Sequence, residues 1–117
     1  MSLSTTKTRD YPKVDRMRGV NYLKNIDNTT YTIANEDKGK VLLLNGAATV
    51  ITVAALSVPV GSQIDFIQTN VALASFVADT GVTLHSKGSL TSMSDTYAGA
   101  TMIKTGPSEW TLIGDLA

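Results

Sequence analysis

The stretch TVITVAALSVPVGSQIDFIQ, residues 49–68, decides the fold class of this chain. Its first half is apolar enough to form a buried helix. Residues 49–53 are mostly β-branched, however, and such side chains lose χ1 freedom in a helix but pack well in a strand. Pro59 and Gly61 then supply turn-forming residues. We therefore predict a strand, a turn and a second strand over residues 62–68.

The second of these strands has two different faces, because successive side chains of a strand point to opposite sides of the sheet. Ile64 and Phe66 are predicted to face the core, on the same side as Ser62 and Gln68. The opposite side carries Gln63, Asp65 and Ile67, so it is partly apolar and partly polar.

The last predicted strand, residues 109–114, repeats this arrangement, with Trp110 and Leu112 on one side and Thr111 and Ile113 on the other. Apolar residues on both faces of a small sheet indicate that the second face is also covered, and in so small a chain we expect the cover to be another subunit. The predicted subunit interface consists of Gln63, Asp65, Ile67 and Ile113.

Short apolar or alternating runs recur along the rest of the chain without a sustained helical period. The spacing leaves no room for crossover helices, so we expect mostly antiparallel pairing and no helix longer than a single turn at NEDKGK, residues 35–40. The prediction is an all-β fold, a small antiparallel β-sandwich or barrel preceded by an extended N-terminal arm. Strands are predicted at 30–34, 40–45, 49–54, 62–68, 73–78, 82–86, 89–93, 97–105 and 109–114.

The chain has 117 residues and no net charge, which suits one domain. Residues 1–24 nevertheless contain six Lys or Arg and two Asp, whereas the remainder contains four basic and eight acidic residues. Composition changes at the same place, so we divide the chain into a basic arm, residues 1–25, and a β body, residues 26–117.

The arm has two interpretations. Its basic and aromatic residues could bind nucleic acid through phosphate contacts and base stacking. They are scattered among Ser, Thr, Pro and Asp, however, so we favour an extended tether that docks on an acidic protein surface. The predicted docking residues are Lys7, Arg9, Tyr11, Lys13, Arg16, Arg18 and Tyr22.

The N-terminal segment lacks the apolar core of a signal peptide, and no run approaches the ~20 apolar residues that span a bilayer. From these features we expect a soluble protein, made in the cytoplasm, that contacts neither membrane nor nucleic acid.

Residues suited to catalysis are sparse. The chain has no Cys, and its one His, His85, lies beside a predicted turn, so we expect no metal site and no cofactor. Carboxylates in turns usually accept hydrogen bonds from their own backbone. Asp65 and Asp95 would serve a glycosidase only if the fold held them ~5–10 Å apart across a cleft. We therefore expect a protein that is not an enzyme.

The body resembles a small β module of bacteriophage virion proteins. The resemblance covers residues 30–117 and is most specific at the C-terminal segment EWTLIGDL. The matching parts, in order, are Tyr31-Thr32, Asp37-Lys38-Gly39-Lys40, Pro59 to Ile64, Gly81 to Ser86, Tyr97 to Lys104 and Glu109 to Leu116.

Such modules occur in head-decorating and head-fibre proteins and in the distal parts of tail fibres or spikes, usually as trimers without catalytic residues. A short arm followed by a single module suits a protein attached directly to the shell. The resemblance thus implies a capsid decoration protein on the outer virion surface, a homotrimer whose partner is the major capsid protein. The alternative is a fibre or spike module that binds a host receptor or surface glycan through loops near Asp79, Lys87 or Asp95.

Overall fold

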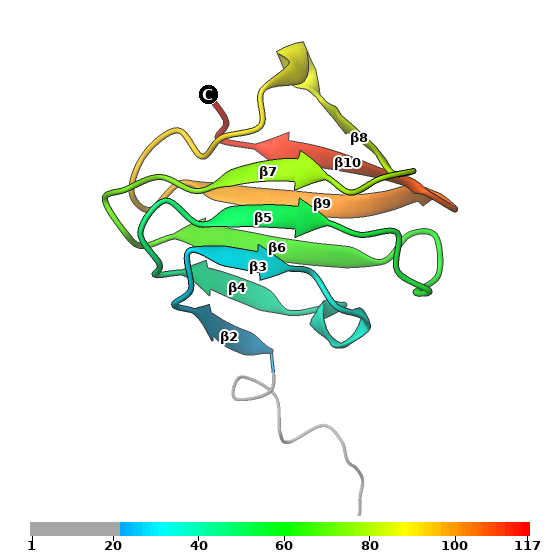
Figure 1. Cartoon of the computed structure of the whole chain (residues 1–117), viewed down its shortest axis with the longest axis horizontal. Coiled ribbons are helices and arrows are strands. Elements are labelled where there is room, and N and C mark those ends of the chain that lie inside the picture. The colour runs from blue at the N-terminus through cyan, green and yellow to red at the C-terminus, as the bar shows by residue number, and fades with distance from the viewer. Residues whose placement is uncertain (1–21) are drawn as a thin grey trace, which may run out of the picture.

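The computed structural model describes residues 22–117, and the regular secondary structure of this part consists almost entirely of β-strands, arranged in two sheets (Figure 1). Two single 3₁₀ turns, η1 (Asn35–Asp37) and η2 (Lys87–Ser89), lie in the connections between strands. The strands are β2 (Leu23–Ile26), β3 (Thr30–Thr32), β4 (Val41–Leu44), β5 (Val50–Val53), β6 (Gln63–Gln68), β7 (Ser75–Ala78), β8 (Thr83–Ser86), β9 (Gly99–Gly106) and β10 (Glu109–Gly114).

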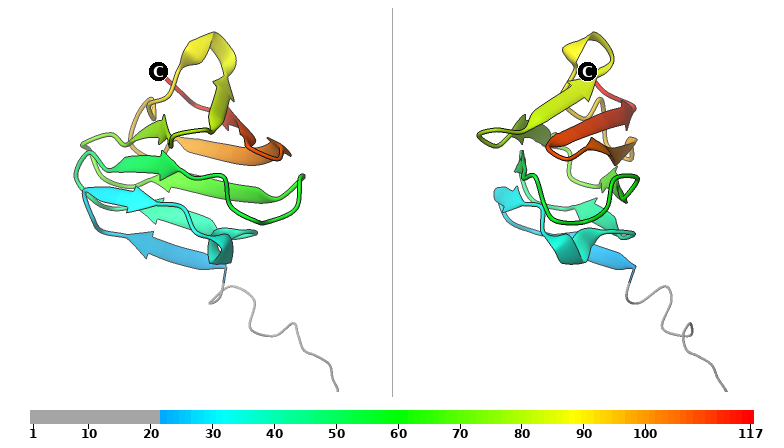
Figure 2. Two further views of the ribbon diagram at one scale, coloured as in Figure 1. Left: turned by 45° about the vertical axis from the view of Figure 1, so that its right-hand side comes forward. Right: turned by 90° about the vertical axis from the view of Figure 1, so that its right-hand side faces the viewer.

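From β2 to β7 the chain alternates between the two sheets. Strands β2, β4 and β6 lie side by side in one sheet, and β3, β5 and β7 form the other. Neighbouring strands within each set are parallel and in register, so that Leu23, Val41 and Asp65 form one row across the first sheet. The chain therefore coils, with one strand in each sheet per turn, and the turns stack along the molecule (Figure 2).

The C-terminal part completes the larger sheet. Strand β9 pairs antiparallel with β6, β10 pairs antiparallel with β9, and β8 lies parallel to β10 at the edge. The larger sheet thus has six strands in the order β2-β4-β6-β9-β10-β8, and the smaller sheet has three in the order β3-β5-β7.

The all-β prediction is confirmed, but the prediction of mostly antiparallel pairing is wrong. Among residues 22–117, five of the seven strand pairings are parallel. The prediction assumed that parallel neighbours need a helix as their crossover. In four of the five parallel pairs a strand of the opposite sheet makes the crossover, which lets short connections produce parallel pairs.

Eight of the nine predicted strands are present, including β5 where a helix was the alternative; β10 has the predicted ends, and the other seven differ at one end or both. The expected strand at 89–93 is absent. There the chain makes only isolated bridges, through Ser92 to Ser75 and through Met93 to Leu116, and so covers the edge of β7. Strand β2 was not predicted, and it crosses the boundary expected near Asn25.

The core lies between the two sheets. As predicted, Ile64 and Phe66 of β6 and Trp110 of β10 are almost completely buried. Phe66 meets Phe76 of the opposite sheet edge to face, with ring centroids 5.0 Å apart, a geometry that aromatic pairs prefer. The alternation read from the sequence therefore identified the inward side of both strands.

The turns at one end of the coil also stack closely. Gly46 approaches the preceding turn so tightly that a Cβ there would lie 2.1 Å from the carbonyl oxygen of Asn28. The buried hydroxyl of Thr49 donates a hydrogen bond to the same carbonyl at 2.6 Å. Only glycine fits this contact, so the stacking of successive turns depends on Gly46.

Candidate functional site

The outward side of the six-stranded sheet is the most extensive candidate surface, and we call it the outer face. It carries the alternate residues of each strand that do not enter the core. Cross-strand registers place these side chains in rows. One row runs Leu23, Val41, Asp65, Thr101, Ile113, a second runs Asn25, Leu43, Ile67, Gly99, and a third runs Gln63, Ile103, Thr111, His85.

All four residues predicted for a subunit interface, Gln63, Asp65, Ile67 and Ile113, lie on the outer face. Ile67 and Ile113 are 37% and 50% exposed, which is high for aliphatic side chains of a sheet. Whether another subunit covers them stays a prediction. The sequence-based selection missed Val41 and Leu43 of β4 and Ile103 of β9, although the alternation of residues 40–45 and 97–105 contains the signal that would have found them.

Asp65 sits in the middle of the outer face and is already hydrogen-bonded within the chain. The hydroxyl of Thr101 donates to its carboxylate at 2.7 Å, and the amide of Gln63 donates at 3.2 Å. The carboxylate is therefore oriented by its neighbours on β9 and β6, through one of its two oxygens.

A shallow hollow lies beside Asp65. It is open over Gly99, which has no side chain, and Ile67 and Ile113 stand on its rim. A Cβ built on Gly99 would meet only the carbonyl oxygen of Phe66, at 3.8 Å. The hollow thus has room for a side chain from outside.

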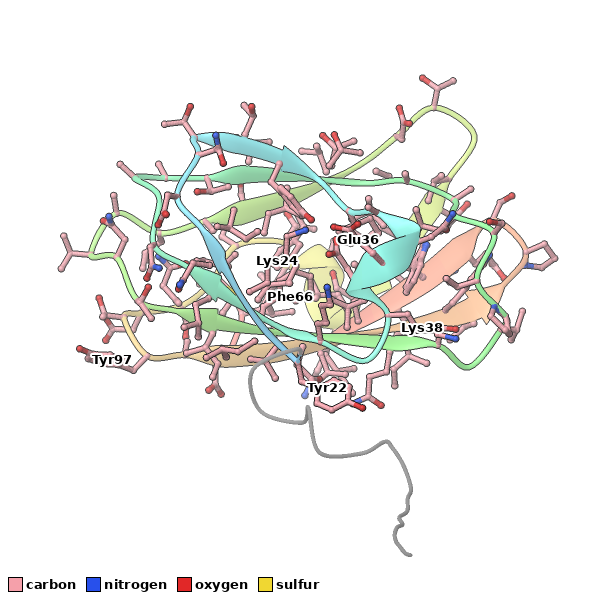
Figure 3. All side chains as sticks on the ribbon, turned by 90° about the horizontal axis from the view of Figure 1, so that it is seen from below. Tyr22, Lys24, Glu36, Lys38, Phe66 and Tyr97 are labelled. Atoms are coloured by element: carbon pink, nitrogen blue, oxygen red, sulfur yellow. The ribbon has the colours of Figure 1, made fainter. Side chains whose placement is uncertain are left out.

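A second candidate is a polar cluster at the N-terminal end of the coil, where Lys24 reaches η1 (Figure 3). The Lys24 ammonium donates to the Tyr31 hydroxyl at 2.8 Å, to Glu36 at 2.9 Å and to Asp37 at 3.1 Å. Asp37 is fully buried and also accepts from the Tyr31 hydroxyl at 2.6 Å and from the backbone N–H of Ala34 at 2.9 Å.

This cluster shifts two pKa values upward. Burial by itself lowers the pKa of Lys24, but hydrogen bonds with Tyr31, Glu36 and Asp37 and the charge of Asp37 outweigh it, so the pKa is raised. Burial raises the pKa of Tyr31, and its hydrogen bond to Asp37 adds to this. Both groups therefore keep their protons at neutral pH, and Lys24 forms ion pairs with Asp37 and Glu36.

The other titratable residues considered from the sequence do not assemble into a catalytic group. His85 lies 3.1 Å from Glu109, and both side chains are about half exposed at the sheet edge. Asp79 and Asp95 each accept a hydrogen bond from the backbone N–H of the following residue, at 2.8 Å. This local pattern is the one expected of carboxylates in turns.

Buried polar side chains that sequence reasoning did not single out fasten the long loops. Lys104 is 5% exposed, and its ammonium donates to the carbonyls of Leu56 and Val58 at 2.8 and 3.0 Å. The amide of Gln68 likewise donates to Asn70 and Ala72. The pattern predicted that Gln68 faces inward, but not that it binds a loop.

Of the predicted docking residues, Tyr22 is described and is 47% exposed just before β2. The remaining ones, Lys7, Arg9, Tyr11, Lys13, Arg16 and Arg18, lie outside the described residues.

Within residues 22–117, no group of three or more His, Cys, Asp or Glu side chains is placed to hold a metal ion. No helix in the described part of the chain has the length and apolar character needed to cross a membrane. Compared with models of known protein families and with curated protein sequences, the chain matches none.

Proposed function

We propose that this chain is a bacteriophage structural protein, a capsid decoration protein that binds the shell through its basic N-terminal arm. The virion's outer surface is its location in this proposal, and synthesis takes place in the host cytoplasm. Its partners are the major capsid protein and, in a homotrimer, further copies of itself. No catalysis, cofactor, nucleic acid or membrane is part of the proposal.

The proposal is supported by the structural role of two residues in the segments that resemble the virion module, because both are buried and hydrogen-bonded within the body. Asp37 of the Asp-Lys-Gly turn is the buried acceptor of the polar cluster. Trp110 of the C-terminal segment is fully buried and donates through Nε1 to the carbonyl of Ala54 at 3.0 Å. Both residues build the framework of the body, as expected of a module whose task is to be a stable scaffold.

The arm supports the choice of a shell-attached protein. Residues 1–24 carry a net positive charge, whereas the rest of the chain carries a net negative charge. A basic arm is suited to an acidic shell surface, because complementary charge adds steering and specificity to an association.

Capsid binding tests this proposal directly. Purified capsids of the source phage, before and after expansion, are mixed with the chain, and co-sedimentation is measured. We expect binding, with preference for one shell state, and raised thermal stability of that shell. A full-length variant with Lys7, Arg9, Lys13, Arg16 and Arg18 changed to Gln should lose binding while the body stays folded.

The matched control changes Lys38 and Lys87 to Gln, which removes positive charge from exposed turns of the body. Undiminished binding by the arm variant would contradict the anchoring role of the arm. A truncation should end before Tyr22, because a deletion of residues 1–25 would remove most of β2.

An exposed aromatic residue favours the alternative, a fibre or spike module that binds a host glycan. Tyr97 is 79% exposed and projects from one end of the body (Figure 3). Its backbone has φ +67°, and its N–H donates to the carbonyl of Gln68 at 2.6 Å. The apolar face of an exposed aromatic ring is suited to packing against a sugar ring. Glycan-array binding that Tyr97→Ala abolishes would favour this function over capsid decoration.

A further inference from the structure

The two sheets differ in what they present to the outside. The outward residues of β3, β5 and β7 form two rows, Thr30, Val50, Ser75 and Thr32, Thr52, Val77. These small, mostly hydroxyl-bearing side chains are typical of a solvated sheet surface. The outer face of the six-stranded sheet instead carries Leu23, Val41, Leu43, Ile67, Ile103 and Ile113 in adjacent rows.

The outward strand residues of the outer face carry no positive charge, and the nearby Lys87 lies off the strands, in a pocket that it lines together with Ile113. No Lys or Arg is among the outward residues of its described strands. Asp65 is bound by Thr101 and Gln63, and His85 and Glu109 pair with each other at the edge. Such a face neither attracts an acidic or polyanionic partner nor repels a second copy of itself.

The size of the outer face fits a protein contact only if most of it is used. With about 4.8 Å between strands and about 3.3 Å per residue, its six strands cover a footprint of roughly 500 Å². The accessible area is larger because the side chains roughen the surface. Stable interfaces bury about 800 Å² per partner, so the central aliphatic residues must be part of any such contact.

The outer face combines protruding and receding features. Ile67 and Ile113 stand exposed on either side of the hollow over Gly99. We propose that the outer face is the surface through which copies of this chain associate, with an exposed isoleucine of one copy entering the Gly99 hollow of the next. This inference rests on the proposed function, of which it specifies the self-association surface.

Sedimentation velocity on the full chain, across micromolar concentrations, tests the proposal. The wild-type chain should sediment as an oligomer. Ile113→Glu should raise the dissociation constant about tenfold or more, because it places a charge beside the Gly99 hollow, within the proposed contact. The control is Val77→Glu, at a site 45% exposed on the opposite sheet, and it should leave the mass unchanged.

Gly99→Leu tests the hollow itself. The substitution fills the hollow from within, and its Cβ makes only an ordinary contact at 3.8 Å. Fluorescence of Trp110, the single tryptophan, verifies folding of each variant. We expect a folded Gly99→Leu chain that dissociates. A folded variant that keeps the wild-type mass would overturn the role of the hollow.

Other outcomes separate this inference from the proposed function. A wild-type chain that is monomeric yet binds capsids would overturn the self-association surface and leave capsid decoration standing. If Ile113→Glu abolished capsid binding of such a monomer, the face would belong to the capsid contact and the inference would again fail. An oligomer that Ile113→Glu dissociates, but that never binds capsids, would support the inference and contradict capsid decoration.

Discussion

Replacing Asp37 by Ala should destabilise the body more than any other change of a single charged residue in the polar cluster. The substitution leaves the Tyr31 hydroxyl and the Ala34 N–H without their acceptor and removes the buried partner of Lys24. Hydrogen bonds to charged groups contribute about 1.5–3 kcal/mol each, and the Asp37 carboxylate accepts three of them. These terms overlap, so we expect a loss of about 3 kcal/mol or more.

The loss is large enough to measure by heat or urea. For a domain of this size, about 4–8 °C of Tm is lost per kcal/mol, so Asp37→Ala should lower the Tm by about 12–24 °C. Trp110 fluorescence and circular dichroism should report the same transition, because the indole is fully buried.

Glu36→Gln is the matched control. Glu36 contacts the same ammonium at 2.9 Å, but its side chain is 66% exposed. Exposed ion pairs contribute about 0–1 kcal/mol, so this variant should unfold close to wild type. Equal stability of Asp37→Ala and Glu36→Gln would refute the argument that burial of Asp37 makes the cluster stabilising.

Three further predictions concern pH, turn packing and the buried lysine. Because the pKa values of Lys24 and Tyr31 are raised, the native state holds more protons than the unfolded chain above pH about 10. The free energy of unfolding should therefore fall as pH rises through this range, and the fall should be shallower in Tyr31→Phe. Urea titrations at several pH values measure this free energy. A urea midpoint that does not change with pH would contradict the prediction. Gly46→Ala should lower the free energy of unfolding by about 2 kcal/mol or more, because its Cβ would lie 2.1 Å from a carbonyl oxygen. Gly99→Ala is the control and should be close to neutral. Similar thermal midpoints for the two variants would show that the turns do not stack as described. Lys104→Met removes the donor to two carbonyls and should lower the free energy of unfolding by about 1–3 kcal/mol. Amide hydrogen exchange should increase first in residues 54–62. Unchanged exchange in these residues would argue against the fastening of this loop by Lys104.

The sequence alone determined which side of β6 and of β10 faces inward. Side-chain alternation has a period of two, so it depends only on the local backbone. It placed Ile64, Phe66 and Trp110 in the core and Asp65 and Ile113 outside, as the structure has them. The β-branched run at 49–53 likewise favoured the strand β5 over a helix for a local, steric reason.

The direction of strand pairing was decided by tertiary structure. The same short strands and turns are compatible with hairpins inside one sheet or with a coil that crosses between two sheets. The choice depends on which distant segments pack together, such as Phe66 against Phe76 and the Gly46 turn against Asn28. Local sequence patterns do not show which distant segments make these contacts, and the prediction of antiparallel pairing failed for this reason.

The partners of polar side chains were also decided only by the fold. From the sequence, Asp37 was a turn residue and Lys104 one residue of a strand. The fold brings the Lys24 ammonium within hydrogen-bond distance of Asp37. It also brings the Lys104 ammonium to the carbonyls of Leu56 and Val58. A hydrogen bond requires two groups within about 3 Å of each other, and for residues far apart in sequence only the packing of the chain sets that distance.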